Sequence, residues 1–245
     1  MPQRKIGIFL DDKDVIVMRF VWKTVFAIIL LAAAYLGLVA VWASSSFNAV
    51  MQAVPAPPMM PLSTRQTAIL LRVEDPTFFS HAGVSLAEGQ GVATISSAVA
   101  RDLYLSDRPL SGISGVLQRF YSRVFDCCKK VDLGRDVMAF VLNAKLPKRN
   151  QLALYVADIY MGSHDGKQVT GLSMAAETYL GKPLDEASEP EFIGLVAMIK
   201  APDQYHPLLH PEQHADRVAR IEALLDGKCK PDGWYDTVYD ACAQR

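Results

Sequence analysis

The chain has 245 residues and a formal net charge of -1 at pH 7, and 51% of its residues are hydrophobic. This length gives room for one sizeable domain and one additional segment. A charge balance this even indicates neither an acidic nor a basic macromolecular partner, so nucleic acid is not an expected partner.

An uncharged apolar segment, residues 25–42, lies close to the N-terminus. As a helix it would be about 27 Å long, which is near the lower limit for spanning a bilayer. Trp22 and Trp42 bracket the segment, as aromatic residues do at membrane interfaces. A cleaved signal peptide, with small residues at 43–45, is the alternative. The long acidic N-terminal region and the length of the apolar run argue against it.

Basic residues are distributed unequally around this segment. Those before it are Arg4, Lys5, Arg19 and Lys23, with Lys13 inside an acidic patch, and no further Lys or Arg occurs until Arg65. This bias predicts that residues 1–23 are cytoplasmic and that most of the chain lies outside the cytoplasm. The expected organisation is then a transmembrane helix over 24–43, an extended proline-rich linker over 44–61, a domain over 62–226 and a tail over 227–245.

Residues 62–74 predict a helix that ends in an acidic pair. Ser63 and Gln66 have the spacing of a capping box. Pro76 pushes Asp75 out of the α region, so the helix should end at Glu74. A carboxylate at a helix C-terminus, with phenylalanines nearby, should have a raised pKa, which suits a general acid or base. The alternative is an exposed acidic pair that only marks a helix end.

The other patterned segments are also helical. Apolar residues recur at helical spacing in 98–105, 113–125, 135–145, 151–161, 172–180, 187–199 and 211–226. No segment alternates with the period of a strand, so the predicted fold class is mainly α. The polar face of 113–125 carries Arg119 and Arg123. That face would lie on anionic lipid or meet phosphates, or it would simply be solvated.

The cysteines and histidines predict no metal site. Cys229 and Cys242 flank a polar tail and could close a small disulfide loop. Cys127 and Cys128 are adjacent, so a bond between them would be strained. Three histidines follow at intervals of four residues, but prolines interrupt any shared helix, which argues against a metal site at His206, His210 and His214.

Five short segments form an ordered set along the chain. The first two read Glu74-Asp75-x-x-Phe78-x-x-His81-x-Gly83 and GVATISS over 91–97. The others are Leu152 to Ala157 with Tyr160 and Gly162, Gly171 to Lys182, and Glu191 with Lys200-Ala201-Pro202-x-x-Tyr205-x-Pro207. In this order they resemble the signatures of the peptidoglycan glycosyltransferases, glycosyltransferase family 51.

The resemblance implies a lysozyme-like, two-lobed glycosyltransferase domain behind one N-terminal transmembrane helix. It implies a protein of the inner membrane, with a periplasmic domain that polymerises lipid II for cell-wall synthesis. Lipid II, lipid-linked glycan and the membrane are the implied partners, and other cell-wall synthesis proteins are further candidates. A divalent cation, Mg²⁺ or Mn²⁺, that neutralises the leaving pyrophosphate stays open.

The resemblance also assigns roles to single side chains. Glu74 matches the family's catalytic base, whereas Phe78, His81 and Gly83 match positions with structural roles. The positions expected to contact substrate are Asp75, Thr94, Ser97, Arg101, Lys129, Lys130, Arg135 and Lys148. Asp75 has a local capping role as its alternative, and the guanidinium of Arg101 could meet a phosphate bidentately.

One signature departs from the family. Counted back from Lys148, the family's second glutamate falls on Arg135 and its Arg-Lys pair falls on Val131-Asp132. Glycan chemistry commonly uses two carboxylates, so three hypotheses follow. The chain is a polymerase with Glu74 as base, or a relative that binds lipid-linked precursor or a synthesis partner without polymerising. The third hypothesis is a lytic enzyme that uses Glu74 as acid.

Overall fold

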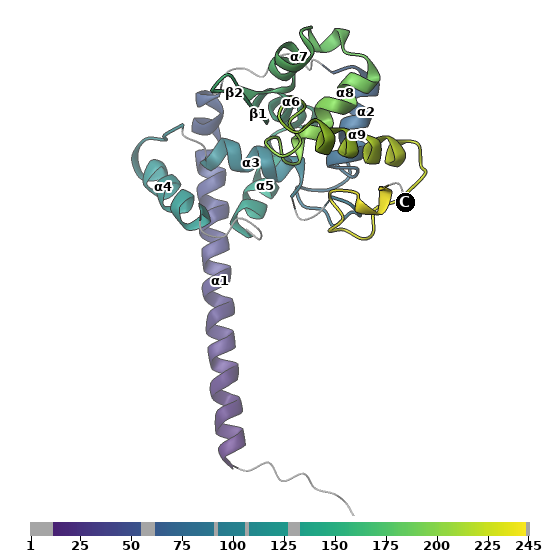
Figure 1. The fold of residues 1–245 in the computed structure, drawn as a ribbon. Helices are drawn as coiled ribbons and strands as arrows, with labels where there is room; N and C mark the ends of the chain where they lie inside the picture. Colours follow the sequence, from purple (N-terminus) through teal and green to yellow (C-terminus); the bar gives the residue numbers. More distant parts are fainter. Residues whose placement is uncertain (1–11, 55–61, 91–92, 106–107, 127–132, 244–245) are drawn as a thin grey trace, which may run out of the picture.

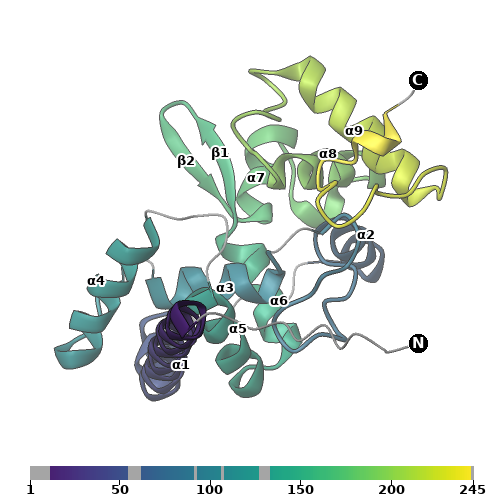
Figure 2. The same cartoon turned by 90° about the horizontal axis from the view of Figure 1, so that it is seen from below.

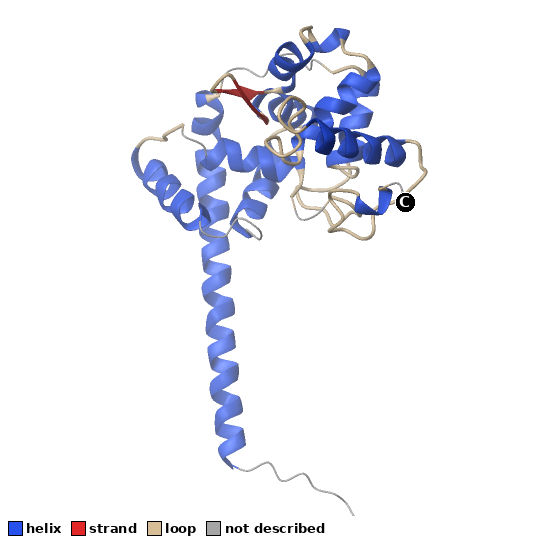
Figure 3. Cartoon of the chain, in the orientation of Figure 1, coloured by secondary structure: helices blue, strands red, loops and turns tan. Residues whose placement is uncertain are grey.

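The computed structural model of the chain describes residues 12–54, 62–90, 93–105, 108–126 and 133–243. These ranges are mainly helical (Figures 1 and 3), which confirms the predicted fold class. The elements are α1 (Asp12–Ala53), α2 (Thr64–Glu74), α3 (Ile95–Leu105), α4 (Gly112–Asp126), α5 (Leu133–Lys145), α6 (Lys148–Asp158), β1 (Tyr160–His164), β2 (Lys167–Thr170), α7 (Leu172–Leu180), η1 (Leu184–Glu186), α8 (Glu189–Ile199), α9 (Pro211–Leu225) and η2 (Asp240–Cys242).

The helices form two groups, which correspond to the two expected lobes (Figures 1 and 2). In the first group, α3, α4 and α5 gather around the C-terminal part of α1. In the second group, α7, α8 and α9 lie together with the β-hairpin, and α2 packs on α8 and α9. Helix α6 packs against both α3 and α7, so it joins the two groups.

Helix α1 is long and apolar, and it extends away from the body of the domain (Figure 1). Every residue over 17–34 is exposed, although most of them are apolar. By length and composition, Val17–Ala53 could cross a membrane, and no second such helix occurs among the described residues. From Tyr35 onward the helix packs on the domain, so the expected span of 24–43 includes residues that contact protein.

The structure differs from the extended linker that was expected from residue 44. Helix α1 continues to Ala53 because no helix-breaking proline occurs before Pro55. Ser46 is buried and donates from its hydroxyl to that of Ser114 at 3.0 Å. Trp42 is buried against Tyr104, so its side chain is covered by protein rather than open to lipid. The proline-rich residues 55–61 lie outside the described ranges.

The predicted boundaries of α2 are confirmed. Ser63 and Gln66 form the capping box reciprocally, with bonds of 2.9 and 3.2 Å between side chain and backbone. The helix ends at Glu74 because Pro76 follows and Asp75 has left the helical region, with φ −158°. The buried apolar side chains of this helix, Ile69, Leu70 and Val73, hold its axis against the core.

The prediction that no strand occurs is wrong for residues 160–170. Here β1 and β2 pair antiparallel, with His164 opposite Lys167. Asp165 and Gly166 form the two-residue turn, and both have positive φ, 50° and 73°. An Asp-Gly pair between two short segments is a strong hairpin signal, because few other residues tolerate these angles. The helix expected over 151–161 accordingly ends at Asp158.

Candidate active site

Glu74 is the last residue of α2 and is half-buried. The hydroxyl of Tyr155 donates to its Oε2 at 3.5 Å, which is a long hydrogen bond. Burial raises the pKa of the Glu74 carboxyl, and the charges of Arg217 and Lys200 oppose that rise only in part. The expectation of a raised pKa at this helix end is therefore confirmed, with desolvation as its main cause.

Two cations accompany this carboxylate. Lys200 follows α8 directly, and burial lowers the pKa of its ammonium while Glu74 raises it. Arg217 lies on α9 with 1% of its surface exposed, and burial likewise lowers the pKa of its guanidinium. Three segments distant in sequence thus place one acidic and two basic groups together. Such a cluster can keep a carboxylate ionised inside a weakly solvated site.

Arg217 has no counterpart among the residues predicted from the sequence. A signal existed, because Arg217, Ile221 and Leu224 share the buried face of α9 at helical spacing. An arginine on an apolar helix face is rarely buried without a charged or aromatic neighbour. Tyr155 belongs to a recognised segment, but no role was predicted for its hydroxyl.

Asp75 lies beside Glu74 in sequence but faces a different environment. It is fully buried and accepts a hydrogen bond from the backbone N–H of Ile95 at 3.0 Å. The ring of His81 lies 3.0 Å away through Nε2. Since Nδ1 of His81 accepts from the N–H of Gly83 at 2.9 Å, the ring proton lies on Nε2 and is donated to Asp75. Asp75 therefore caps the N-terminus of α3, which is the local capping role named above as the alternative to substrate contact.

Gly83 is required by its surroundings. Its φ is +134°, and a Cβ there would lie 2.9 Å from the backbone carbonyl of Ala139 on α5. Any larger residue would strain this approach. Phe78, with 1% exposure, packs in the same segment against Phe79. Gly83 and Phe78 both hold the loop that follows Glu74.

Thr94 and Ser97 form the N-terminal cap of α3. The Thr94 hydroxyl donates to the carbonyl of Gly83 at 2.6 Å and accepts from the N–H of Ser97 at 3.0 Å. Ser97 accepts in return from the N–H of Thr94 at 2.9 Å. Both side chains are buried, with 2% and 1% exposure. Their hydroxyls hold the helix end in this structure, so contact with substrate would require these bonds to change.

Lys148 approaches the first signature from α6. Its ammonium donates to the Ser96 hydroxyl at 2.9 Å and lies 4.5 Å from the ring centre of Phe78. Partial burial lowers the pKa of this ammonium to about 8, and the charge of Asp75 opposes the shift. Lys148 therefore carries a positive charge at neutral pH close to the loop that follows Glu74.

Of the other predicted cationic positions, Arg101 and Arg135 lie within the described residues, and each has a carboxylate neighbour of its own. Arg101 is exposed and bonds its own neighbour Asp102 at 3.2 Å. Arg135 is buried on α5, with Asp136 at 3.5 Å. Lys129 and Lys130 lie outside the described residues.

The histidines of the C-terminal third contact the backbone. His206 lies 3.2 Å from the carbonyl of Ser163, and His214 lies 2.9 Å from that of Gly194. Within the ranges that the structure describes, no three His, Cys, Asp or Glu side chains form a group that could hold a metal ion.

Fold and site together define a class of protein: a mainly helical, lysozyme-like domain behind an apolar helix, with a half-buried carboxyl of raised pKa at the end of α2. The sequence profile of the Transglycosylase family matches residues 52–225. The chain therefore belongs to this family, the peptidoglycan glycosyltransferases of glycosyltransferase family 51, as a divergent member.

Individual relatives support this assignment. Penicillin-binding protein 1B of Escherichia coli (strain K12) is 28% identical over 159 residues, which are 64% of this chain and 18% of the relative. Penicillin-binding protein 1A of Pseudomonas aeruginosa is 28% identical over 162 residues, 60% of this chain and 17% of the relative. Penicillin-binding protein 1A of Streptococcus oralis is 29% identical over 165 residues, which are 65% of this chain and 24% of the relative. The chain thus spans no more than about a quarter of these curated relatives.

Proposed function

We propose that this chain is a membrane-anchored peptidoglycan glycosyltransferase that polymerises lipid II, with Glu74 as its general base. The observation that carries the proposal is the environment of Glu74. Burial raises the pKa of its carboxyl, and Arg217 and Lys200 favour its ionised form. A base of this kind accepts a proton best when its pKa lies close to the working pH.

The chemistry follows from the groups present. A sugar hydroxyl of the acceptor attacks the anomeric carbon of the donor while its proton passes to the Glu74 carboxylate. The bond from that carbon to the lipid pyrophosphate breaks, and the pyrophosphate leaves with both bonding electrons. Attack on the face opposite the leaving group inverts the anomeric configuration. Proton transfer to a positioned base typically contributes about 10²–10⁴ in rate.

The leaving pyrophosphate needs positive charge. Lys148 and Arg101 are the described candidates among the positions that match the family, and the Lys148 ammonium lies over the ring of Phe78, in the segment that follows Glu74. Its ammonium is held by Ser96 and the Phe78 ring, so it is ordered before substrate binds. A preorganised cation stabilises developing negative charge more effectively than one that must first be ordered.

Anchoring follows from α1. Its exposed apolar residues over 17–34 would be unfavourable in water but are suited to a lipid bilayer. The basic residues before and within this stretch favour a cytoplasmic N-terminus, with the domain in the periplasm. A polymerase on such an anchor would meet its lipid-linked substrate at the membrane surface.

The test is polymerisation of lipid II by the full chain in lipid nanodiscs, with the glycan products separated by gel electrophoresis. The wild type should give polymer, and Glu74→Gln should give none above background. Glu88→Gln is the matched control, because Glu88 is an exposed carboxylate on the loop that follows α2. A wild type that binds lipid II without making polymer would contradict the proposal.

A second candidate function rests on Arg135. Counted back from Lys148 without gaps, the family's second glutamate falls on this residue, which is buried on α5 beside Asp136. A domain with this change would bind lipid-linked precursor without joining it. Arg135→Glu decides between the two, because a gain of polymer in this variant over an inactive wild type would identify an intact but disabled scaffold.

A further inference from the structure

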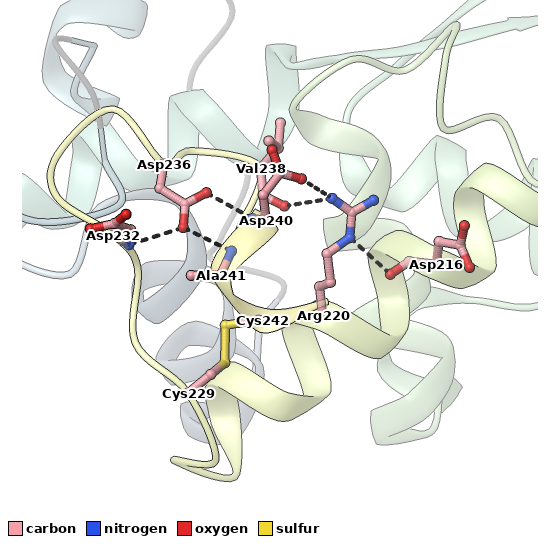
Figure 4. The surroundings of a disulfide bond; sticks show 9 residues. All are labelled: Asp216, Arg220, Cys229, Asp232, Asp236, Val238, Asp240, Ala241 and Cys242. Carbon is pink, nitrogen blue, oxygen red and sulfur yellow. Dashed lines mark hydrogen bonds and ion pairs between the residues drawn. A yellow bond between two sulfur atoms is a disulfide. The ribbon is translucent and has the colours of Figure 1, made fainter. Parts of the chain in front are cut away.

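The tail after α9 is held in a closed loop. Cys229 and Cys242 form a disulfide, with their Cα atoms 5.4 Å apart (Figure 4). The carboxylate of Asp236 accepts from the N–H groups of Asp232 at 3.0 Å and Asp240 at 2.8 Å. The loop that the cysteine spacing predicted therefore has an ordered interior as well as a covalent closure.

This loop is fastened to α9 by two arginines. Arg220 donates to the carbonyl of Val238 at 3.1 Å and to the carboxylate of Asp240 at 2.8 Å (Figure 4). Arg217 donates to the carbonyl of Thr237 at 3.2 Å. The same arginine whose charge acts on Glu74 thus also holds the tail.

Tyr239 is the residue of the tail that contacts the candidate active site. Its side chain is 2% exposed, and its hydroxyl donates to the carbonyl of Val73, the residue before Glu74. Its ring centre lies 4.7 Å from the guanidinium carbon of Arg217, which is a cation–π contact. One side chain therefore contacts both the last turn of α2 and the buried cation beside Glu74.

The tail also packs on the loop that follows Glu74. The N–H of Gly89 donates to the carbonyl of Gly233 at 2.9 Å. A Cβ at Gly89 would lie 2.5 Å from the Pro231 ring and 2.9 Å from that of Tyr239, so this approach requires glycine. Three separate parts of the domain, α2, α9 and the loop at Gly89, converge on one segment of the tail.

Arg217 would be poorly held without Tyr239. Two of its nitrogens, Nε and Nη1, are buried and have no hydrogen-bond partner among the described residues. Its other aromatic neighbour, Tyr205, lies farther away, at 5.7 Å. Loss of the Tyr239 ring would open a path for water to both the guanidinium and Glu74, and desolvation is the main influence on the carboxyl of Glu74.

We propose that Tyr239 is a positioning residue for Glu74, and that the disulfide-closed tail completes the candidate active site by holding Arg217 and the end of α2. The match to the Transglycosylase family ends at residue 225, so Tyr239 and the disulfide lie outside the region shared with the family profile. The proposal rests on the proposed role of Glu74 as base, but it concerns the protonation of that carboxyl and can be measured without substrate.

The experiment follows the carboxyl-carbon NMR signal of Glu74 in the full chain, in detergent micelles, with Glu74→Gln to assign it. Tyr239→Leu should lower the midpoint of titration by at least about 0.5 pH unit, because water then reaches the carboxylate. Desolvation has a larger effect on the pKa of this carboxyl than the charge of Arg217, so the fall should outweigh the rise caused by a displaced guanidinium. Tyr239→Phe keeps the ring and should stay closer to the wild type. Tyr235→Leu is the matched control, since Tyr235 is an exposed tyrosine of the same tail.

The disulfide provides a second, milder perturbation. A Cys229→Ser and Cys242→Ser double variant keeps Tyr239 but loosens the loop, and the Glu74 midpoint should again fall. If circular dichroism shows that Tyr239→Leu has not folded, the Glu74 midpoint of this double variant tests the proposal instead. A folded variant of either kind with the wild-type midpoint overturns the proposal. Because no substrate is present, that result is independent of whether the chain polymerises lipid II.

Discussion

The carboxylate of Asp75 accepts the backbone N–H of Ile95 at 3.0 Å, which ties the residue after the proposed base to the first turn of α3. The link joins two of the segments that define the family, and it is fully buried. One carboxylate of the adjacent pair thus organises the loop, while the other accepts, among the residues that the structure describes, one long hydrogen bond from Tyr155. This division of roles gives a direct prediction for each residue.

Asp75→Ala should destabilise the domain. The change removes a helix cap and leaves the donors of Ile95 and His81 buried without a partner, which should cost about 2–4 kcal/mol. For a domain of this size, the melting temperature should fall by about 4–15 °C. The melting temperature is measured by monitoring thermal unfolding with circular dichroism, and Glu88→Ala is the control at an exposed carboxylate. An Asp75→Ala protein as stable as the control would refute the capping role.

Glu74→Gln should have the opposite effect on stability, and the effect should depend on pH. Because burial raises the folded-state pKa of Glu74 above its ordinary value of 4.5, ionisation destabilises the folded state. The stability difference should favour Glu74→Gln above the folded-state pKa and disappear as the pH falls towards about 4. Melting temperatures of both proteins across this range test the sign. A variant less stable than the wild type at neutral pH would contradict the burial argument.

How much of this site the sequence could predict depends on the range of the interactions. The end of α2 follows from Ser63, Gln66 and Pro76, which act within a few residues of one another, and those predictions are confirmed. The neighbours of Glu74 come from α9 and the tail, and no local pattern connects Arg217 or Tyr239 with a residue on α2. Only packing in three dimensions brings these groups together.

Errors elsewhere have equally specific causes. The linker prediction used the composition of 44–61 as a whole, although the helix-breaking residues begin only at Pro55. The hairpin was missed because its strands are too short to show alternation, even though the Asp165-Gly166 turn was visible. The position of Trp42 at the end of the apolar segment does not reveal that Tyr104 covers its side chain.

Tyr155→Phe should shift the pH dependence of polymerisation. The Tyr155 hydroxyl donates to the Glu74 carboxylate and so lowers its pKa. Without this bond the pKa of Glu74 rises, and the acidic limb of the rate profile should move to higher pH by less than about 1 unit, since the bond is long. The rate well above that limb should change little. An acidic limb that stays in place or moves to lower pH would show that this bond does not act on the base.

Lys148→Gln should weaken the binding of lipid II. If the Lys148 ammonium contacts the donor pyrophosphate, its loss should raise KM by about tenfold or more, the usual effect of removing a charged hydrogen-bond donor. Burial lowers the pKa of this ammonium to about 8, so the wild-type KM should rise as the pH passes that value. In Lys148→Gln this rise of KM with pH should be absent. Arg149→Gln, at an exposed neighbour, provides the control.

The central claim is that Glu74 removes the proton from the attacking hydroxyl. The most direct measurement is the single-turnover rate of glycosidic bond formation from lipid II by wild type and Glu74→Gln, from about pH 4 to about pH 9. The wild-type rate should rise with pH through one ionisation above the ordinary glutamate value of 4.5. Glu74→Gln should be slower by about 10² or more and lack that limb. A variant that retains both the rate and the limb would contradict the account.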